Sequence, residues 1–232
     1  MIPSPLGEYD PSEVIPPQVL ERLKEIRKYV VEEARTARRY LSAAGLKGHV
    51  AELEFHELNE HTKPAEVEAL LSMFSDPDGS PTDVGLVSEA GLPAVADPGA
   101  RLVALCHDHG IKVVPMVGPS SLMLALMGSG LNGQSFAFCG YLPAKADERR
   151  KAIREIERRS SQLNQTEIFI ETPYRNDSMM ADLLAALQPE TRLCVAADIT
   201  LPDETILTKS VRHWRRTPFT IGKRPCVFLI LA

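Results

Sequence analysis

A loop rich in glycine and proline follows a short apolar run and offers main-chain groups to a ligand. Gly91 and Gly99 permit positive φ angles and close approach of bound atoms, whereas Pro93 and Pro98 fix φ and cannot continue a sheet. Main-chain N–H and C=O groups can hold a small molecule with few charged side chains. We therefore predict a ligand-binding loop over residues 88–99, with a rigid structural turn as the alternative.

The same loop leads into a helical pattern. Asp97 precedes Pro98 and the apolar run at residues 100–106, so we expect Asp97 to cap this helix with Pro98 at its first position. Ligands of open α/β sheets bind outside the carboxyl ends of the strands, which is where this loop must lie.

Apolar runs alternate with helical patterns along the chain, which is typical of an α/β protein with mostly parallel strands. The predicted strands are residues 28–32, 51–55, 83–87, 111–115, 136–139, 166–171, 192–198, 204–209 and 226–231. The predicted helices are residues 17–26, 36–44, 64–74, 99–109, 120–127, 147–160 and 176–187. No Pro/Ser-rich linker divides the chain, so we expect two α/β domains, residues 1–117 and 118–232, packed closely across a short connection.

Composition excludes several classes of protein. The 232 residues are 44% hydrophobic, which is ample for a globular core. No apolar run approaches the roughly 18 residues of a membrane span, and the start lacks a signal-peptide pattern, so a cytoplasmic location without a membrane partner is expected. The four cysteines form no CxxC pair, which suggests reduced core residues and no metal site. A net charge of −5 excludes a generally basic nucleic-acid binder but permits a local basic face.

The amino terminus has an unusual pattern. Residues 3–7 read like a loop that follows a strand, yet only Met1 and Ile2 precede them. Strands are usually about 5–6 residues long, so the first strand is expected to be truncated.

Short motifs occur in a fixed order over nearly the whole chain. They read PSPLG at 3–7, VEEARTARR at 31–39, HELNE at 56–60, GPSS at 118–121, GYLPAK at 140–145 and FIETPYR at 169–175. Together with the loop at 84–99, this series resembles the tetrapyrrole methylase superfamily of S-adenosylmethionine-dependent methyltransferases. Within it, the chain is most similar to the branch that methylates the 2'-oxygen of a cytidine in small-subunit (16S) ribosomal RNA.

This resemblance implies two α/β domains with S-adenosylmethionine in the cleft between them, usually in a homodimer, and S-adenosylhomocysteine as the product. Carried over position by position, the cofactor contacts would be Leu6, Ala90, Gly91, Leu92, Val95, Ser120, Ser121, Glu171, Thr200 and Pro225. Several members of the superfamily have Asp where this chain has Leu92. A side-chain contact from that position is lost here, whereas main-chain contacts could survive.

Methyl transfer asks the protein mainly to place nucleophile and cofactor in attack geometry. A ribose hydroxyl is a poor nucleophile, so an RNA 2'-O-methyltransferase should gain from a general base. The candidates are His56, Glu33 and Glu89. A structural loop histidine is the alternative for His56, and an ion-paired helix start is the alternative for Glu33.

Cationic and aromatic side chains suggest contacts to RNA. The expected substrate contacts are Arg35, Arg38, Arg39, Asn59, Arg101, Tyr141 and Lys145. Acidic residues interleave with the basic group at 145–154, so ordinary surface ion pairs are the favoured alternative there. A third basic run, at 212–224, contains Trp214, for which packing in the core is favoured over stacking on a base.

One departure from the ribosomal RNA branch affects the choice of function. That branch continues past the methylase core into a small helical extension, whereas this chain ends at residue 232 on its last predicted strand. The leading hypothesis is an RNA 2'-O-methyltransferase acting on ribosomal RNA or the small subunit, because of the arginines at 35–39. A methylase of a tetrapyrrole or another small molecule and a non-catalytic cofactor-binding homologue are the alternatives.

Overall fold

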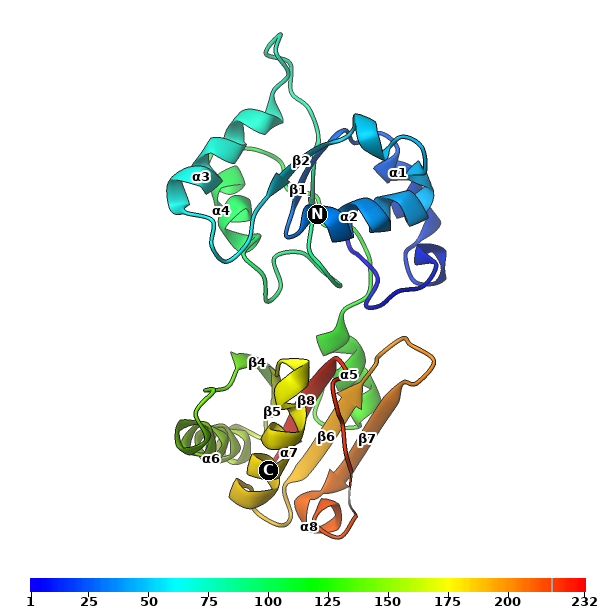
Figure 1. Ribbon diagram of the computed structural model, residues 1–232. Helices are drawn as coiled ribbons and strands as arrows, with labels where there is room; N and C mark the ends of the chain where they lie inside the picture. Colours follow the sequence, from blue (N-terminus) through cyan, green and yellow to red (C-terminus); the bar gives the residue numbers. More distant parts are fainter. Residues whose placement is uncertain (218) are drawn as a thin grey trace. The chain divides into compact units, whose positions relative to one another are not determined.

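In the computed structural model, which describes residues 1–217 and 219–232, the chain divides into two units, Met1–Ser120 and Ser121–Ala232 (Figure 1). The first unit contains a parallel three-stranded sheet in the order β2-β1-β3. Its strands are β1 (Lys28–Val31), β2 (Glu54–Glu57) and β3 (Val84–Val87). Its helices are α1 (Pro17–Leu23), α2 (Ala34–Leu41), α3 (Pro64–Ala69) and α4 (Ala100–Asp108), with short 3-10 or π turns at Pro11–Glu13, Ser42–Leu46, Val50–Glu52 and Leu70–Phe74.

The central strand β1 is buried on both faces. Tyr29 and Val31 pack in one apolar cluster with Leu41 of α2, whereas Val30 packs in another with Leu102 of α4. Successive side chains of a strand point to opposite faces, so the two clusters lie on the two sides of the sheet. Parallel strands covered on both faces read as continuous apolar runs, which is why the sequence predicts β1 and β3 well.

The prediction of a strand at residues 111–115 is wrong, because the structure assigns no strand there. Instead, the amino group of Met1 donates to the Val114 carbonyl at 3.0 Å, and the Met116 amide donates to the Met1 carbonyl at 3.1 Å. Ile2 forms an isolated parallel bridge with Val87 of β3. Only two residues therefore lie between β3 and this segment, which is too few to extend the sheet across it.

Two further elements differ from the sequence analysis. β2 begins at Glu54 rather than at residue 51, because residues 50–52 form a 3-10 turn. The short helix α8 (Val211–Trp214) was not predicted, since its four residues are too few to show a helical period.

The second unit contains a mixed five-stranded sheet in the order β4-β5-β8-β6-β7. Its strands are β4 (Phe136–Tyr141), β5 (Thr166–Ile170), β6 (Arg192–Ala197), β7 (Thr205–Ser210) and β8 (Cys226–Leu231). Its remaining helices are α5 (Ser121–Ser129), α6 (Ala146–Leu163) and α7 (Asn176–Ala186), with a 3-10 turn at Pro173–Arg175. The predicted α/β class is confirmed for the chain.

The expectation of mostly parallel strands is wrong for this second sheet. Only β4 and β5 pair in parallel, whereas β8 runs antiparallel to both β5 and β6, and β6 runs antiparallel to β7. The connection from β6 to β7 at residues 198–204 is too short to hold the crossover that a parallel pair needs. Apolar runs alone do not distinguish the two directions.

Burial decides the role of two groups singled out in the sequence. The Trp214 ring is 2% exposed and its Nε1 donates to the Leu193 carbonyl at 2.9 Å, so it packs in the core as favoured. All four cysteines are free thiols. Within residues 1–217 and 219–232, no helix is long and apolar enough to cross a membrane, and no His, Cys, Asp or Glu side chains group as metal ligands.

Candidate functional site

Two loops of the first unit are joined at the carboxyl end of β3. The Ser4 amide donates to the Gly91 carbonyl at 2.9 Å, and the Gly91 amide donates back to the Ser4 carbonyl at 3.1 Å. The Ser4 hydroxyl also donates to the Ser88 carbonyl at 3.2 Å. We call this pair of residues the Ser4–Gly91 clasp. It holds the loop at residues 3–9 against the loop that follows β3.

Gly91 fits this clasp for two reasons. Its φ is +78°, in the left-handed region that favours glycine. A Cβ at this position would lie 3.2 Å from Leu6 Cδ2 and 3.4 Å from the Pro119 carbonyl oxygen. Three segments predicted to contact a cofactor therefore meet at Gly91, and the third of them leads directly to Ser120 and Ser121.

A hollow of about 420 Å³ lies beside the clasp. Among its lining residues are Leu6, Glu89 and Ala90 of the two loops, with Arg39 and Tyr40 of α2. The buried Tyr40 hydroxyl donates to the Pro3 carbonyl at 2.7 Å and so fixes the first loop to α2. This volume lies within the range of small-molecule sites in proteins. We refer to it as the clasp hollow.

The remainder of the loop after β3 is bent around Asp97. This carboxylate accepts from the Ala94 amide at 2.9 Å and from the Gly99 amide at 2.7 Å. Ala94 and Ala96 have φ angles of 68° and 63°, which are uncommon for residues with a Cβ. The capping role expected for Asp97 is wrong, because Gly99 is the N-cap residue of α4 and Asp97 instead ties the loop together. Strained loops of this kind are often found at functional sites.

Val95 and Leu92 differ in exposure within this loop. Val95 is 45% exposed, whereas Leu92 is partly buried and its carbonyl accepts from the Val95 amide at 3.3 Å. Their side chains are apolar, so this part of the loop offers a ligand an uncharged surface.

Glu32 is a carboxylate that the sequence reasoning missed. It directly follows β1, and its Oε2 accepts from the Glu89 amide at 3.2 Å. Burial raises the pKa of Glu32, and the neighbouring carboxylates of Asp97, Glu89 and Glu60 raise it further. Burial also raises the pKa of Asp97, which lines the same small hollow as Glu32. The sequence did contain one signal for Glu32, because this residue lies at the carboxyl end of a predicted buried strand, one residue before Glu33.

Glu33 is the N-cap of α2. Its carboxylate accepts from the amides of Arg35 and Thr36 at 2.9 and 2.6 Å and from the Thr36 hydroxyl at 2.7 Å. These bonds from Thr36 and Arg35 hold the pKa of Glu33 below its usual value. A carboxylate so fully bonded is a weak proton acceptor, so its geometry favours helix capping.

His56, Asn59 and Arg101 lie near one another at the other edge of the sheet. His56 Nε2 is 2.7 Å from Glu54 Oε1 within β2, and its side chain is 43% exposed. His56, Asn59 and Thr62 line one shallow hollow, and Arg101 donates to the Thr62 carbonyl at 3.4 Å. Asn59 Oδ1 accepts from the His61 amide at 3.0 Å, which makes it part of a local turn.

The arginines at 35, 38 and 39 all lie on α2 and are exposed. The Arg38 guanidinium lies 4.7 Å above the centre of the Phe55 ring, and Arg39 forms an exposed ion pair with Glu8 at 3.1 Å. Two of the three thus have partners within the unit, although exposed pairs of this kind are weak enough to exchange for a phosphate.

In the second unit, Glu171 is 5% exposed. Its Oε1 accepts from the Thr172 amide at 2.7 Å and from Arg175 at 2.6 Å, whereas its Oε2 is buried with no hydrogen-bond partner among the described atoms. Tyr141, at the end of the neighbouring strand, is opposite Ile170 and is 57% exposed. A buried carboxylate oxygen without a donor suggests a missing partner.

Thr200 follows Asp198 by two residues, and Pro225 is hydrogen-bonded to Asp198. The Asp198 amide donates to the Pro225 carbonyl at 3.0 Å, and Thr200 has a φ of 71°. The Thr200 amide donates to Glu204 Oε2 at 2.8 Å. Two predicted cofactor residues are therefore close to one another in this unit.

The basic group at 145–154 forms ion pairs, but only some of them are the surface pairs with interleaved acids that the favoured alternative expected. Arg149 is 4% exposed and its Nε donates to Asp182 at 2.8 Å, and Arg150 donates to the same carboxylate at 2.7 Å. Lys145 lies 3.4 Å from Glu148 and is exposed. Of these three, Arg149 is buried, whereas the side chains of Lys145 and Arg150 are 82% and 43% exposed.

Comparison with known proteins gives a family and relatives. Residues 14–213 match the family described as Tetrapyrrole (Corrin/Porphyrin) Methylases. The chain is 34% identical over 207 residues to the Ribosomal RNA small subunit methyltransferase I of Vibrio cholerae serotype O1. The aligned residues make up 89% of this chain and 66% of that protein. A protein of the same name from Neisseria meningitidis serogroup B is 38% identical over 180 residues, or 78% of this chain and 57% of the relative.

Solved structures share the fold at low identity. The methyltransferase CobJ aligns with a TM-score of 0.61 at 17% identity and covers 94% of this chain and 88% of its own. A diphthine synthase aligns with a TM-score of 0.62 at 17% identity and covers 99% of this chain and 88% of its own. This chain spans 66% and 57% of the lengths of the two sequence relatives named above.

Proposed function

The chain belongs to the tetrapyrrole (corrin/porphyrin) methylase family, and from this premise we propose that it is an S-adenosylmethionine-dependent methyltransferase of small-subunit ribosomal RNA. The acceptor that we propose is the 2'-oxygen of a cytidine, on the resemblance of the ordered motifs. The observation that carries the proposal is the Ser4–Gly91 clasp, because it joins loops that the family motifs assign to the cofactor.

The residues of the clasp suit the proposed cofactor. Leu6 and Leu92 offer apolar contacts, and the left-handed Gly91 lets main-chain groups approach a ligand closely. In the second unit, Glu171 Oε2 would accept from a hydroxyl or amino donor. When bound, S-adenosylmethionine supplies a methyl group already activated by its sulfonium. The protein's remaining task is to orient the acceptor and to exclude water.

The acceptor hydroxyl must lose its proton as the new oxygen–carbon bond forms. A carboxylate with a raised pKa is the better acceptor for that proton. We therefore add Glu32 to the candidates Glu89 and His56, because Glu32 is partly buried among other carboxylates whereas Glu33 is fully bonded as a helix cap.

Arg35, Arg38 and Arg39 are the proposed phosphate contacts, supported by their exposure on one helix. Arg35→Gln is expected to weaken RNA binding and to reduce the slope of log affinity against log salt by about 1. The matched control is Arg212→Gln, since Arg212 is an exposed arginine of the second unit that pairs with Glu190. Equal losses in the two variants would contradict an RNA contact at Arg35.

The decisive test is transfer of a labelled methyl group into small ribosomal subunits from cells that lack this activity, followed by mapping of the labelled nucleotide. Label on the 2'-oxygen of one cytidine is the expected result. Calorimetry with S-adenosylhomocysteine is the companion measurement. Binding without label in RNA would point to a small-molecule acceptor such as a tetrapyrrole, and no binding would contradict the methyltransferase proposal.

We also propose a homodimer, on the family resemblance alone. Sedimentation velocity over a range of protein concentrations tests it. A monomer at micromolar concentration would contradict it.

A further inference from the structure

Three exposed aromatic side chains follow one another along β4, which is the edge strand of the second sheet (Figure 1). The side chains are those of Phe136, Phe138 and Tyr141, and these residues are 41%, 38% and 57% exposed. Among the residues that the structure describes, Tyr174 is the one other exposed aromatic residue. We call Phe136, Phe138 and Tyr141 the β4 aromatic strip.

A bulge in β4 places all three rings on one face of the sheet. Phe136 and Phe138 share a face because they are two residues apart. In a regular strand Tyr141 would lie on the opposite face, since it follows Phe138 by three residues. The register against β5 shifts between Phe138 and Tyr141, so that both lie beside residues of β5 that are themselves two apart. Gly140, with a φ of +67°, lies within this bulge.

The two faces of β4 differ in how they are covered. On one face, Cys139 packs against the core cluster that contains Ile153 of α6. The other face carries the strip, and the strand registers place Phe138 on the same face as Thr208 of β7. There the Thr208 hydroxyl donates to the carbonyl of Ser129 at the end of α5, and α5 packs on β6, β7 and β8. The rings on β4 stay exposed, and apolar side chains on an open edge strand favour association with another molecule.

The surroundings of the strip lack negative charge. Residues 121–146 contain no Asp or Glu, although the whole chain has 31 acidic residues. Lys145 lies four residues after Tyr141, and its side chain is 82% exposed. Its pair with Glu148, at 3.4 Å, is exposed and therefore weak. This segment can thus approach a polyanion without repulsion from its own carboxylates.

The strip leads toward the predicted cofactor residues of the same unit. Tyr141 lies beside Ile170 of β5, and Glu171 directly follows Ile170. Tyr174 also follows β5, and the Arg175 guanidinium lies 5.5 Å from the centre of its ring. A chain that lies along the strip would therefore reach the end of the sheet where Glu171 is found.

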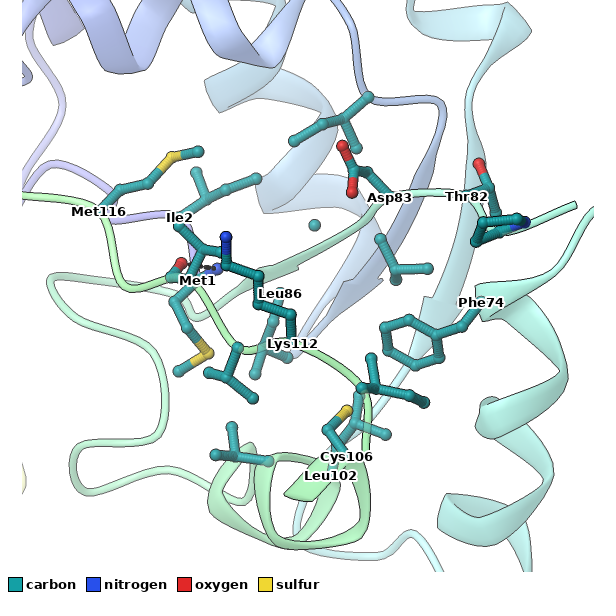
Figure 2. Close-up of a pocket in the computed structure, with 18 of the residues that line it drawn as sticks. Met1, Ile2, Phe74, Thr82, Asp83, Leu86, Leu102, Cys106, Lys112 and Met116 are labelled. Carbon is teal, nitrogen blue, oxygen red and sulfur yellow. Dashed lines mark hydrogen bonds between the residues drawn. The ribbon is translucent and has the colours of Figure 1, made fainter. Parts of the chain in front are cut away.

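The first unit offers a different kind of apolar surface. A groove of about 430 Å³ runs beside β3 and shares no lining residue with the clasp hollow (Figure 2). Its apolar lining is mainly aliphatic, as at Leu86 and Leu102. Phe74 is the one aromatic residue among its described lining residues. The groove therefore lacks a row of rings.

We propose that the β4 aromatic strip binds single-stranded RNA by stacking bases on its rings. The inference rests on the proposed function, because it names a contact of the same RNA substrate in the second unit. In RNA-binding sheets, aromatic side chains on the strands stack two or three bases, and such stacking tolerates any base. A second copy of the chain is the competing occupant. Aliphatic side chains would serve a protein interface equally well, whereas every exposed position of the strip carries a ring.

The first test removes one ring and keeps its apolar bulk. Phe138→Leu should weaken binding of a labelled single-stranded oligocytidylate of about eight nucleotides about tenfold, as measured by fluorescence anisotropy. Binding of S-adenosylhomocysteine and the urea midpoint should stay unchanged. The matched control is Leu163→Ala, since Leu163 is an apolar residue of α6 that is 57% exposed. Equal RNA affinity of the original chain and Phe138→Leu would overturn the proposal.

The second test keeps a ring and reports on stacking directly. Phe138→Trp should retain RNA affinity, and its indole fluorescence should be quenched by the same oligocytidylate. The native Trp214 is buried in the core, so it should contribute little to this change. Leu163→Trp is the control and should show no quenching. Quenching that is equal in both variants would contradict a site on the strip.

Two further measurements separate this inference from the proposed function. In methyl transfer to small ribosomal subunits, Phe138→Leu should raise the KM for the subunits and leave the KM for S-adenosylmethionine unchanged. If the original chain binds oligocytidylate through the strip but transfers no methyl group to RNA, the strip stands and the proposed function fails. Sedimentation velocity tests the competing occupant. A dimer that dissociates in Phe138→Leu while RNA affinity is unchanged would assign the strip to a second copy and overturn the proposal.

Discussion

The two units differ in how they hold buried charge. In the second unit, burial acts to raise the pKa of Asp182, but hydrogen bonds from Arg150 and Arg149 outweigh it and hold that pKa below its usual value. In the first unit, burial raises the pKa of both Glu32 and Asp97, which line one small hollow. The second unit therefore pairs opposite charges, whereas the first unit gathers like charges.

The difference separates buried charge that is paired with an opposite charge from buried charge that is gathered with like charge. A buried carboxylate with two guanidinium partners fixes α6 against α7, because Arg149 and Arg150 lie on α6 and Asp182 lies on α7. Carboxylates gathered at the ends of parallel strands cost stability and are typical of binding and catalytic sites. Arginines that lie close together in the sequence therefore do not by themselves predict a contact to RNA.

The largest expected effect is in the paired cluster. Asp182→Asn leaves the buried Arg149 guanidinium without a counter-charge, which should reduce the free energy of unfolding by about 3–5 kcal/mol. Urea denaturation followed by circular dichroism measures it. The matched control is Glu155→Gln, which breaks an exposed ion pair with Arg158 and should cause no measurable change. Equal effects would contradict a structural role for the paired cluster.

The next effect tests whether the clasp serves a ligand. Gly91→Ala should reduce the free energy of unfolding by about 1–2 kcal/mol, because φ is +78°, and should also abolish binding of S-adenosylhomocysteine in calorimetry. Gly79→Ala is the control, since Gly79 has a φ of +83° with nothing within 4 Å of an added Cβ. It should cost similar stability and leave binding intact. Loss of binding in both variants would indicate general destabilisation.

A smaller effect depends on pH and tests the gathered carboxylates. The folded-state pKa of Glu32 is raised, so ionising it costs stability as pH rises from its unfolded value, near 4.5, through the folded value. Glu32→Gln removes that cost and should stabilise the protein at neutral pH, with the gain vanishing below the unfolded pKa. Because Glu32 is only partly buried, solvent screening keeps this gain small. Urea midpoints at pH 4 and pH 7 measure it, and a gain that grows toward low pH would refute the assignment.

The smallest effect separates the arginines of α2 from one another. Arg38→Gln removes a guanidinium from above the Phe55 ring and should cost about 0.5–1 kcal/mol of unfolding free energy. Arg35→Gln is the control and should change RNA binding but not stability. Chemical denaturation and a filter-binding assay on both variants give the two readouts. If both variants lose stability equally, the three arginines form one structural group.

Much of the fold could be predicted because buried strands and helices show apolar patterns in their own stretch of sequence. β8 and β6 read as continuous apolar runs and lie where predicted, as does the long helix α6. The apolar run at 111–115 is equally clear in the sequence, yet it forms no strand. A strand needs a neighbour for its main-chain bonds, and that neighbour is not visible in the run itself.

The candidate site could be predicted only in part. The ordered motifs identified the family, and the glycine at 91 indicated close approach of a ligand. Which of two adjacent carboxylates is bonded as a helix cap and which is left among other acids depended on contacts from distant segments. Glu33 bonds the start of its own helix, whereas Glu32 meets the Glu89 amide across the sheet edge.

The sequence by itself determined the family, the α/β class and the loop after β3, because motif order and apolar periodicity are local properties of the chain. Only the tertiary structure decided the direction of the second sheet, the pairing of Arg149 and Arg150 with Asp182, and the groove beside β3. These depend on which main-chain edges and charges meet in space, and neighbours far apart in sequence leave no periodic signal.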